Sequence, residues 1–145
     1  MRFLKKLKRF FGLEEKEPIK EIKITREAMD KIILLAKENH PNEFVTFFEG
    51  KIKDGTIIIE DVLFQPYYAN DHSVFTHIDF PLTSKVLGSI HSHPGPSNRP
   101  SRADLHLFGK TGIVHGIIHE PYTEGSLAMY DNNGEPLIYS VEQRQ

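Results

Sequence analysis

The residues with the clearest chemical potential lie in one stretch, HSHPGPSNRPSRAD, at residues 91–104. His91 and His93 are alternate residues at the end of an apolar segment that has the pattern of a strand. Alternate strand residues share a face, so both imidazoles can converge on one ion while Ser92 points away. A proline-stiffened loop then leads to a helix whose first turn presents Asp104. Two imidazoles and one carboxylate leave a fourth position for water, which is typical of catalytic zinc.

The end of this stretch also has a purely structural interpretation. Ser101 can be the N-cap of the helix and Asp104 its third residue, which together form a capping box that needs no metal. Taken alone, the SRAD segment favours this interpretation. The two histidines before it favour a metal site.

Hydrolysis at a zinc site also needs a group that moves a proton. Glu43 is preferred, because it begins an apolar strand segment, where an inward-facing charge is costly without a function. The other nearby carboxylates lie close to strand ends and turns, where solvated acids are common; they are Glu49, Glu60 and Asp61. The alternative is that Glu43 is a solvated residue at the first position of its strand.

The composition limits the available chemistry. The absence of cysteine excludes disulfides and cysteine nucleophiles, so a metal must be bound by His, Asp or Glu. The acidic main part of the chain argues against nucleic acid as a partner. We expect a cytoplasmic protein, because no apolar run approaches the roughly 18 residues of a membrane-spanning helix and a secretion signal is not evident.

The elements that position these residues follow the hydrophobic pattern. We expect one domain, with a short strand at 19–24, a helix that is capped by Thr25 and ends near Asn39, and the residues His40 and Pro41 as its stop. Strands are predicted at 43–50, 56–68, 72–79, 86–94, 112–120, 126–131 and 136–143, and a second helix at 101–110. This pattern predicts an α/β or α+β fold in which at least two helices flank a mixed sheet.

A basic segment precedes the domain. Residues 1–13 carry five basic residues and no acidic one, which leaves thirteen basic residues against twenty acidic ones in the remainder. Apolar residues recur in it at helical spacing, at Phe3, Leu4, Leu7, Phe10 and Phe11. This amphipathic helix can lie on the inner surface of an anionic membrane, or pack on the domain or on a second copy in a homodimer. We therefore divide the chain into residues 1–18, a segment with its linker, and the domain 19–145.

Other histidines are interpreted as structural. His115 and His119 share a strand face, but three ligands already complete the predicted zinc set, so both are expected to be packed or surface residues. The same interpretation applies to His72, His77 and His106.

Together these features resemble the JAMM metalloproteases, also called the JAB1/MPN/Mov34 family, and most closely its compact archaeal and bacterial members. The similarity spans roughly residues 24–140 and includes HPNEF and GSIHSHPGPSNRPSRADLHLF. It implies a strongly curved, partly barrel-like sheet sandwiched between helices. It also implies the site residues: His91, His93 and Asp104 as zinc ligands, Glu43 as the general base and Ser101 as a helper for the oxyanion.

The resemblance implies an isopeptidase that cleaves after the C-terminal glycine of a ubiquitin-like protein. Glu43 would take a proton from the attacking water and deliver it to the departing amine, commonly a lysine side chain. The chain has no room for the long insertions of eukaryotic members, so we expect a small modifier rather than a polyubiquitin chain. Two alternatives remain open: a zinc hydrolase that processes the C-terminus of a sulfur-carrier protein, and a metal-free scaffold.

Overall fold

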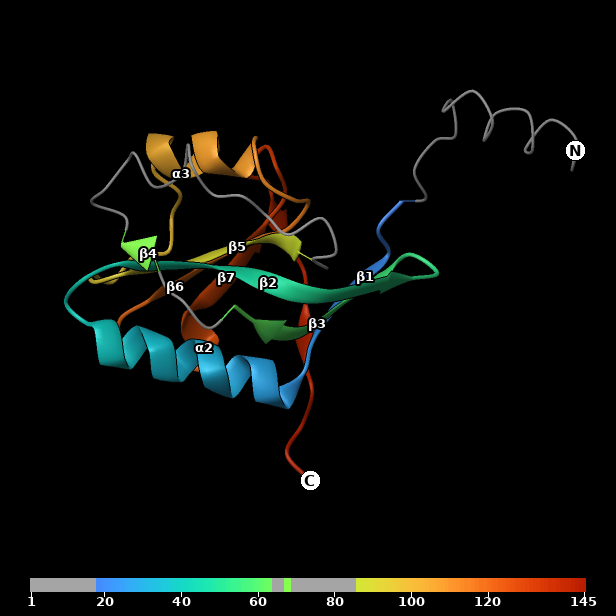
Figure 1. Cartoon of the computed structure of the whole chain (residues 1–145), viewed down its shortest axis with the longest axis horizontal. Helices are drawn as coiled ribbons and strands as arrows, with labels where there is room; N and C mark the ends of the chain where they lie inside the picture. The colour runs from blue at the N-terminus through green and yellow to red at the C-terminus, as the bar shows by residue number, and fades with distance from the viewer. Residues whose placement is uncertain (1–17, 64–66, 69–85) are drawn as a thin grey trace, which may run out of the picture.

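The computed structural model describes residues 18–63, 67–68 and 86–145. Within these residues one mixed sheet has a helix on each of its two faces (Figure 1). This confirms the predicted fold class. The strand predicted at 72–79 and the basic segment 1–13 lie outside the described residues. In the part that is described, no helix is both long enough and apolar enough to cross a membrane.

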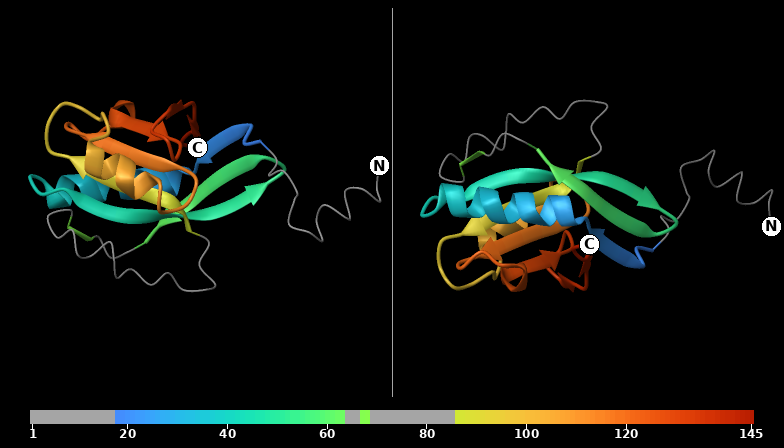
Figure 2. Two further views of the ribbon diagram at one scale, coloured as in Figure 1. Left: turned by 90° about the horizontal axis from the view of Figure 1, so that it is seen from above. Right: turned by 90° about the horizontal axis from the view of Figure 1, so that it is seen from below.

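The described part of the chain forms strands, two helices and a 3-10 turn. They are β1 (Glu21–Ile24), α2 (Arg26–Asn39), β2 (Phe44–Lys53), β3 (Thr56–Val62), β4 (Tyr67–Tyr68), β5 (Val86–His93), α3 (Arg102–Phe108), β6 (His115–His119), a 3-10 turn (Glu124–Ser126), β7 (Leu127–Tyr130), β8 (Pro136–Leu137) and β9 (Ser140–Val141). In Figure 2, α3 lies over the sheet in the view from above and α2 in the view from below.

The strands run in the order β8-β7-β6-β5-β2-β3-β1-β9, and β4 pairs with β2. The pairs β5–β6, β1–β3 and β1–β9 are parallel. β5 therefore lies between β2 and β6 in the middle of the sheet, where both of its edges are hydrogen-bonded. The turn between β2 and β3 has positive φ angles of 52° at Asp54 and 80° at Gly55. This is the hairpin turn that the Asp-Gly pair predicts.

The C-terminal segment corrects one prediction. A single strand at 136–143 was expected, but β8 pairs with β7 while β9 pairs with β1, at the other end of the sheet order. Only two residues separate β8 from β9, and the first of them, Ile138, is 95% exposed. The segment therefore passes from one edge strand to the other, and the sheet curves into a half-barrel.

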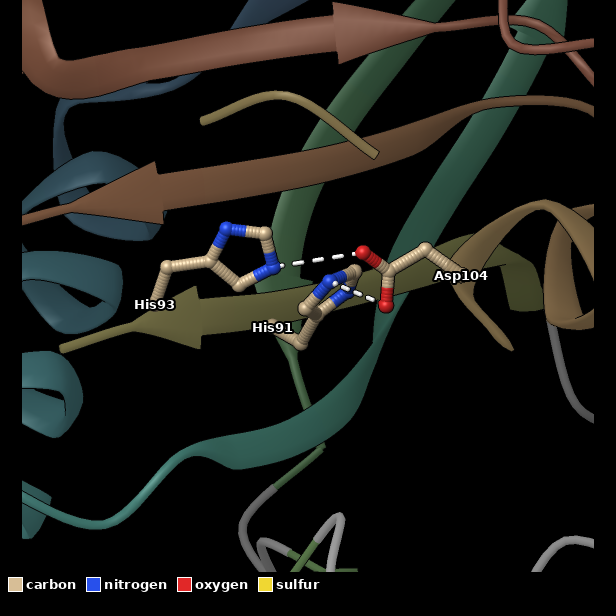
Figure 3. Close-up of side chains that lie close together, drawn as sticks. All are labelled: His91, His93 and Asp104. Carbon is tan, nitrogen blue, oxygen red and sulfur yellow. Dashed lines mark hydrogen bonds and ion pairs between the residues drawn. The ribbon is translucent and has the colours of Figure 1, made fainter. Parts of the chain in front are cut away.

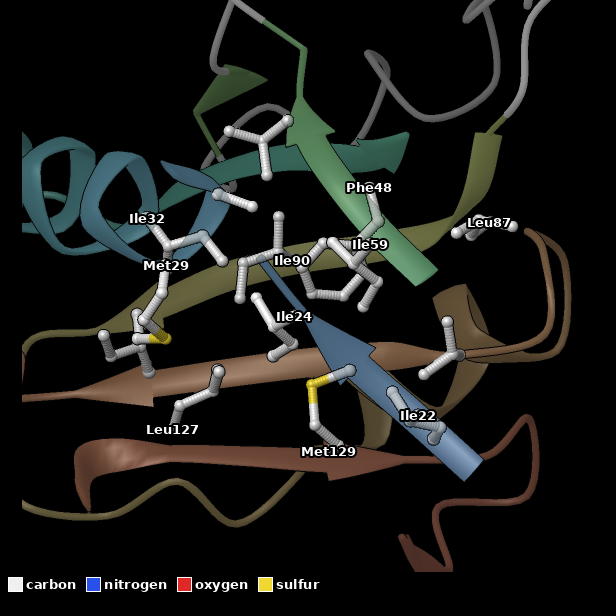
Figure 4. Packing of buried hydrophobic residues seen from close by; sticks show 14 of the residues in the cluster. Ile22, Ile24, Met29, Ile32, Phe48, Ile59, Leu87, Ile90, Leu127 and Met129 are labelled. Atoms are coloured by element: carbon white, nitrogen blue, oxygen red, sulfur yellow. The ribbon is translucent and has the colours of Figure 1, made fainter. Parts of the chain in front are cut away.

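Helix α2 forms as its sequence predicts. The Thr25 hydroxyl accepts the N–H of Ala28 at 3.1 Å, and the His40 N–H donates to the carbonyl of Ala36 at the other end. Four residues at helical spacing are fully buried against the sheet: Ala28, Met29, Ile32 and Ala36. They join the main core with residues such as Ile24, Ile59 and Ile90 (Figure 4). Each large aliphatic side chain buried there contributes about 1.5–3 kcal/mol.

The two faces of the sheet differ in character. The main core lies on the α2 face, whereas a smaller cluster on the α3 face contains Phe108, Ile117 and Tyr130. Strand β5 contributes to both faces, because Ile90 joins the main core and the next residue, His91, points the other way. His91 therefore lies on the less apolar face of β5, and the main core on the other face holds this strand in place.

Candidate metal centre

Strand β5 and helix α3 bring three side chains together. His91 and His93 project from the same face of β5, and their ring centroids lie 5.1 Å apart. The first turn of α3 presents the Asp104 carboxylate so that it faces both rings (Figure 3). Nε2 of His91 is 3.0 Å from one carboxylate oxygen, and Nε2 of His93 is 3.2 Å from the other. The structure thus places the three residues together as the sequence predicted.

The donor set of these three residues fits a metal ion. Nδ1 of His93 is 2.9 Å from the Ser97 carbonyl and donates its proton there, which leaves a lone pair on Nε2 facing the carboxylate. His91 is 1% exposed; its Nδ1 has no hydrogen-bond partner among the described residues, and its Nε2 faces the Asp104 carboxylate at 3.0 Å. One ligand atom from each residue lies within 4.8 Å of the others. Buried acceptors that face one another in this way need a cation between them.

The charges of the site favour an ionised carboxylate. Burial alone would raise the pKa of Asp104, but the contacts with His91 and His93 and the N–H of Ser101 outweigh it and lower this pKa well below its ordinary range. Burial alone would lower the pKa of His93, but the contact with Asp104 outweighs burial, and the pKa of His93 is raised. In the contact between His93 and Asp104, each group therefore favours the charged form of the other.

The capping box and the metal site are not alternatives. The Ser101 hydroxyl accepts the Asp104 N–H at 3.1 Å, and the Asp104 carboxylate accepts the Ser101 N–H at 2.7 Å. The oxygen that accepts this N–H also faces His93. The cap therefore aims the carboxylate at the imidazoles. The same arrangement of Ser101 and Asp104 caps the helix and faces the two histidines.

The loop between β5 and α3 is tied to its neighbours by polar contacts. The hydroxyl of Tyr130 donates to the Asn98 carbonyl at 2.6 Å, and the Asn98 side chain reaches the Ser126 carbonyl at 3.3 Å. These contacts hold the loop against β7 and its preceding turn. Sequence reasoning identified the prolines of this loop but assigned no role to Asn98, which lies within the motif, and missed Tyr130, which follows 32 residues later and which nothing in the motif marks.

Glu43 reaches the same face through the register of two strands. Val45 of β2 pairs with His91, and the ladder continued by two residues places Glu43 opposite His93. Glu43 is half-buried, and its charge is one of the factors that raise the pKa of His93. The buried Ser92 hydroxyl accepts the N–H of Phe44 at 3.0 Å and so ties this segment to β5. Ser92 points away from the ligands as expected, but its role in holding β2 was not foreseen.

His115 is a packed residue, as predicted. Its ring is fully buried and stacks on Phe108 with centroids 4.4 Å apart. Nδ1 accepts from the hydroxyl of Ser89 at 2.8 Å, and Nε2 donates to the side-chain oxygen of Asn132 at 2.8 Å. Phe108 follows Asp104 by one helical turn, so both lie on the same side of α3. The stack therefore fixes the rotation of the helix that carries the carboxylate.

Two further histidines of the described residues, His106 and His119, are not part of this cluster. His119 is half-exposed, and its Nδ1 lies 2.6 Å from the Glu120 carbonyl. His106 is exposed on α3. His72 and His77 lie outside the described residues.

The chain is similar to proteins of one family over most of its length. Residues 25–130 match the family model described as prokaryotic homologs of the JAB domain. A protein of Haloferax volcanii named a probable metalloprotease is 36% identical over 121 residues, which cover 77% of this chain and 74% of that protein.

Two solved structures have the same fold. One, described as JAMM, a metalloprotease-like zinc site in the proteasome and signalosome, is 34% identical with a TM-score of 0.65 and covers 86% of this chain and 100% of its own. The other, a JAB1/MPN domain protein from Archaeoglobus fulgidus, is 36% identical with a TM-score of 0.66 and covers 83% of this chain and 99% of its own. These similarities confirm the predicted fold and the predicted cofactor, zinc.

The buried His115 predicts a pH dependence of stability. Burial and the charge of His91 lower the pKa of His115 to about 4, whereas an unfolded histidine titrates near 6.5. Between these values the unfolded chain binds a proton that the folded chain does not. The free energy of unfolding of the metal-free protein should therefore fall as the pH falls through this window, by up to about 3 kcal/mol.

The measurement is denaturant unfolding at several pH values between 4 and 7. His115→Gln should remove this part of the pH dependence, whereas His106→Gln, at an exposed position on α3, should keep all of it. If the free energy of unfolding changed with pH equally in the His115 variant and in the wild type, His115 would not be the residue responsible.

Proposed function

This chain belongs to the family of prokaryotic homologues of the JAB domain, and we propose on that premise that it hydrolyses amide bonds with the help of a bound zinc ion. The observation that carries the proposal is the convergence of two imidazole nitrogens on one carboxylate, at 3.0 and 3.2 Å. We assign His91, His93 and Asp104 as the zinc ligands. When bound, zinc supplies a Lewis acid that polarises the substrate carbonyl and favours the ionisation of water.

The protein groups around the ligands prepare them for this role. The Ser97 carbonyl fixes the tautomer of His93, so that Nε2 offers its lone pair. The N–H of Ser101 orients the Asp104 carboxylate, and the contacts with His91 and His93, with a smaller part from this N–H, lower its pKa. Removing either imidazole would leave the half-buried carboxylate without one of its two imidazole partners.

Glu43 is the proposed proton carrier. When the pairing of β2 with β5 is continued by two residues beyond Val45 and His91, Glu43 lies opposite His93. This position is on the face of the sheet where the ligands lie. Glu43 would accept a proton from the attacking water and then deliver it to the leaving amine, as a general base followed by a general acid. Both transfers need one carboxylate at one fixed position, which the bond between the Phe44 N–H and Ser92 supports.

Ser101 is the proposed helper for the oxyanion. Its hydroxyl oxygen accepts the N–H of Asp104, which leaves its hydrogen free to donate to a substrate. The residue is exposed and adjoins the carboxylate ligand in the capping box. It would stabilise the negative oxygen that forms when water adds to the amide carbonyl.

The proposed substrate is the bond after the C-terminal glycine of a ubiquitin-like protein. The resemblance of residues 24–140 to the compact JAMM proteins supports this class. An isopeptide bond to a lysine side chain is our first choice, and a linear extension of a sulfur-carrier protein is the second. Presenting both bonds on the same ubiquitin-like protein and following the product masses would separate the two.

Replacement of Glu43 should separate metal binding from hydrolysis. Glu43→Gln should keep about one zinc per chain but lose roughly 100-fold or more in kcat, because it removes the proton acceptor and spares the ligands. Asp104→Ala should lose both zinc and activity. The measurements are metal analysis and cleavage of the isopeptide-linked substrate. Glu49→Gln is the matched control, since it neutralises another half-buried acid of the same hairpin. Substantial turnover by the Glu43 variant would refute its role.

Ser101→Ala should reduce both stability and activity. Loss of the cap should cost about 1 kcal/mol in the free energy of unfolding, and loss of the oxyanion donor about 100-fold in kcat. Thr25→Ala is the matched control, because Thr25 caps α2 with the same bond length of 3.1 Å and plays no part in the site. It should show the same loss of stability with unchanged turnover. If the two variants cleave at equal rates, Ser101 is only a cap.

We also propose that residues 1–13 bind the anionic inner surface of a membrane. Their five basic residues and their apolar residues at helical spacing support this. Deleting residues 1–13 should reduce cosedimentation with vesicles that contain anionic lipids and leave substrate cleavage unchanged. Added salt should weaken the binding of the full chain. Equal vesicle binding with and without the segment would exclude this role, and packing on the domain or on a second copy would then be favoured.

A further inference from the structure

One tyrosine hydroxyl lies between the segment that carries Glu43 and the strand that carries the ligands. Tyr122 is 4% exposed, and its hydroxyl lies 2.8 Å from Nδ1 of His40. The same hydroxyl donates to the backbone carbonyl of His93 at 3.4 Å. The rings of Tyr122 and His40 meet edge to face with centroids 5.6 Å apart. None of these contacts has a part in the reaction proposed above.

The backbone of Tyr122 indicates that this placement is enforced. Its φ angle is +61°, in the left-handed region that bulky residues rarely adopt. The Tyr122 N–H donates to the His119 carbonyl at 2.8 Å and closes a tight turn after β6. Such conformations persist where the surrounding contacts determine them, and they are found preferentially at functional sites. The ring is therefore held in one orientation between its two partners.

The segment that bears Glu43 is anchored on both sides. On one side, the Phe44 N–H donates to the hydroxyl of Ser92 at 3.0 Å. On the other, His40 lies at the end of α2, three residues before Glu43, and its ring contacts the Tyr122 hydroxyl. Both anchors end on β5, at the two consecutive residues Ser92 and His93.

We propose that Tyr122 and His40 are positioning residues that hold the Glu43 segment at a fixed distance from the metal-binding strand. His40 donates its Nδ1 proton to the tyrosine oxygen, and the tyrosine donates its own proton to the His93 carbonyl. One hydroxyl thus links two segments that are distant in sequence. The inference rests on the proposed function, because it gives Glu43 its part in proton transfer.

Positioning of this kind affects the rate rather than the binding of metal or substrate. A proton acceptor must lie within hydrogen-bond reach of the proton that it takes. Tyr122→Phe removes one oxygen atom and keeps the ring, so the three proposed ligands are spared. It should lower kcat by about 10-fold to 100-fold, since a misplacement of about 1 Å can cost roughly 100-fold. The KM and the affinity for zinc should be unchanged.

The chain offers a matched control. Tyr139→Phe also removes a partly buried hydroxyl that donates to a backbone carbonyl, in this case that of Leu127 at 2.6 Å, on strand β7, which β6 and β5 separate from β2 in the sheet. It should leave kcat unchanged. His40→Phe should behave as Tyr122→Phe does, and the double variant should be no slower than either single variant, because both changes break the same link.

A second measurement does not depend on activity. In the metal-free protein, the amide of Phe44 should exchange its hydrogen about 10-fold faster in Tyr122→Phe than in the wild type, because one anchor of its segment is lost. Tyr139→Phe should not change this rate. If the wild type cleaves no substrate, the proposed function fails and the exchange rate alone decides the positioning role. Wild-type exchange at Phe44 in Tyr122→Phe would overturn the proposal, as would a loss of zinc affinity parallel to the loss of kcat.

Discussion

Two imidazole nitrogens and a carboxylate face one another across about 3 Å in a partly buried space, and the rest of the domain is arranged around this contact. Groups of this kind are costly to remove from water unless a cation joins them. A metal ion satisfies all three at once, whereas a proton satisfies one pair. The site is therefore held in a geometry that favours binding a metal over remaining empty.

This geometry depends on a division between the two faces of the sheet. The α2 face carries most of the apolar core and fixes β5 between β2 and β6. The α3 face carries only a small apolar cluster, and its helix has seven residues. So short a helix has little stability of its own. The capping box at one end and the stack of Phe108 on His115 at the other fix its position, and Asp104 lies between them.

Backbone carbonyls and amides connect the site to the fold. The Ser97 carbonyl orients His93, the Asn98 carbonyl receives the Tyr130 hydroxyl, and Ser92 holds the strand that follows Glu43. Contacts of this kind decide the orientation of metal ligands and proton carriers to within a fraction of an ångström. In this domain they involve β2, β7, the turn after β6 and the loop between β5 and α3, so segments that are distant in the sequence hold the site together.

The sequence by itself determined the local parts of this protein: the shared face of His91 and His93, the cap at Ser101, helix α2 with its Thr25 cap, and the hairpin at Asp54 and Gly55. Each follows from the geometry of a few consecutive residues. Only the tertiary structure decided the pairing of β2 with β5 that places Glu43, the contact between Tyr122 and His40, and the division of the last strand between two sheet edges. These depend on strand register and on curvature, which arise from contacts between residues far apart in the chain and leave no mark in a local pattern.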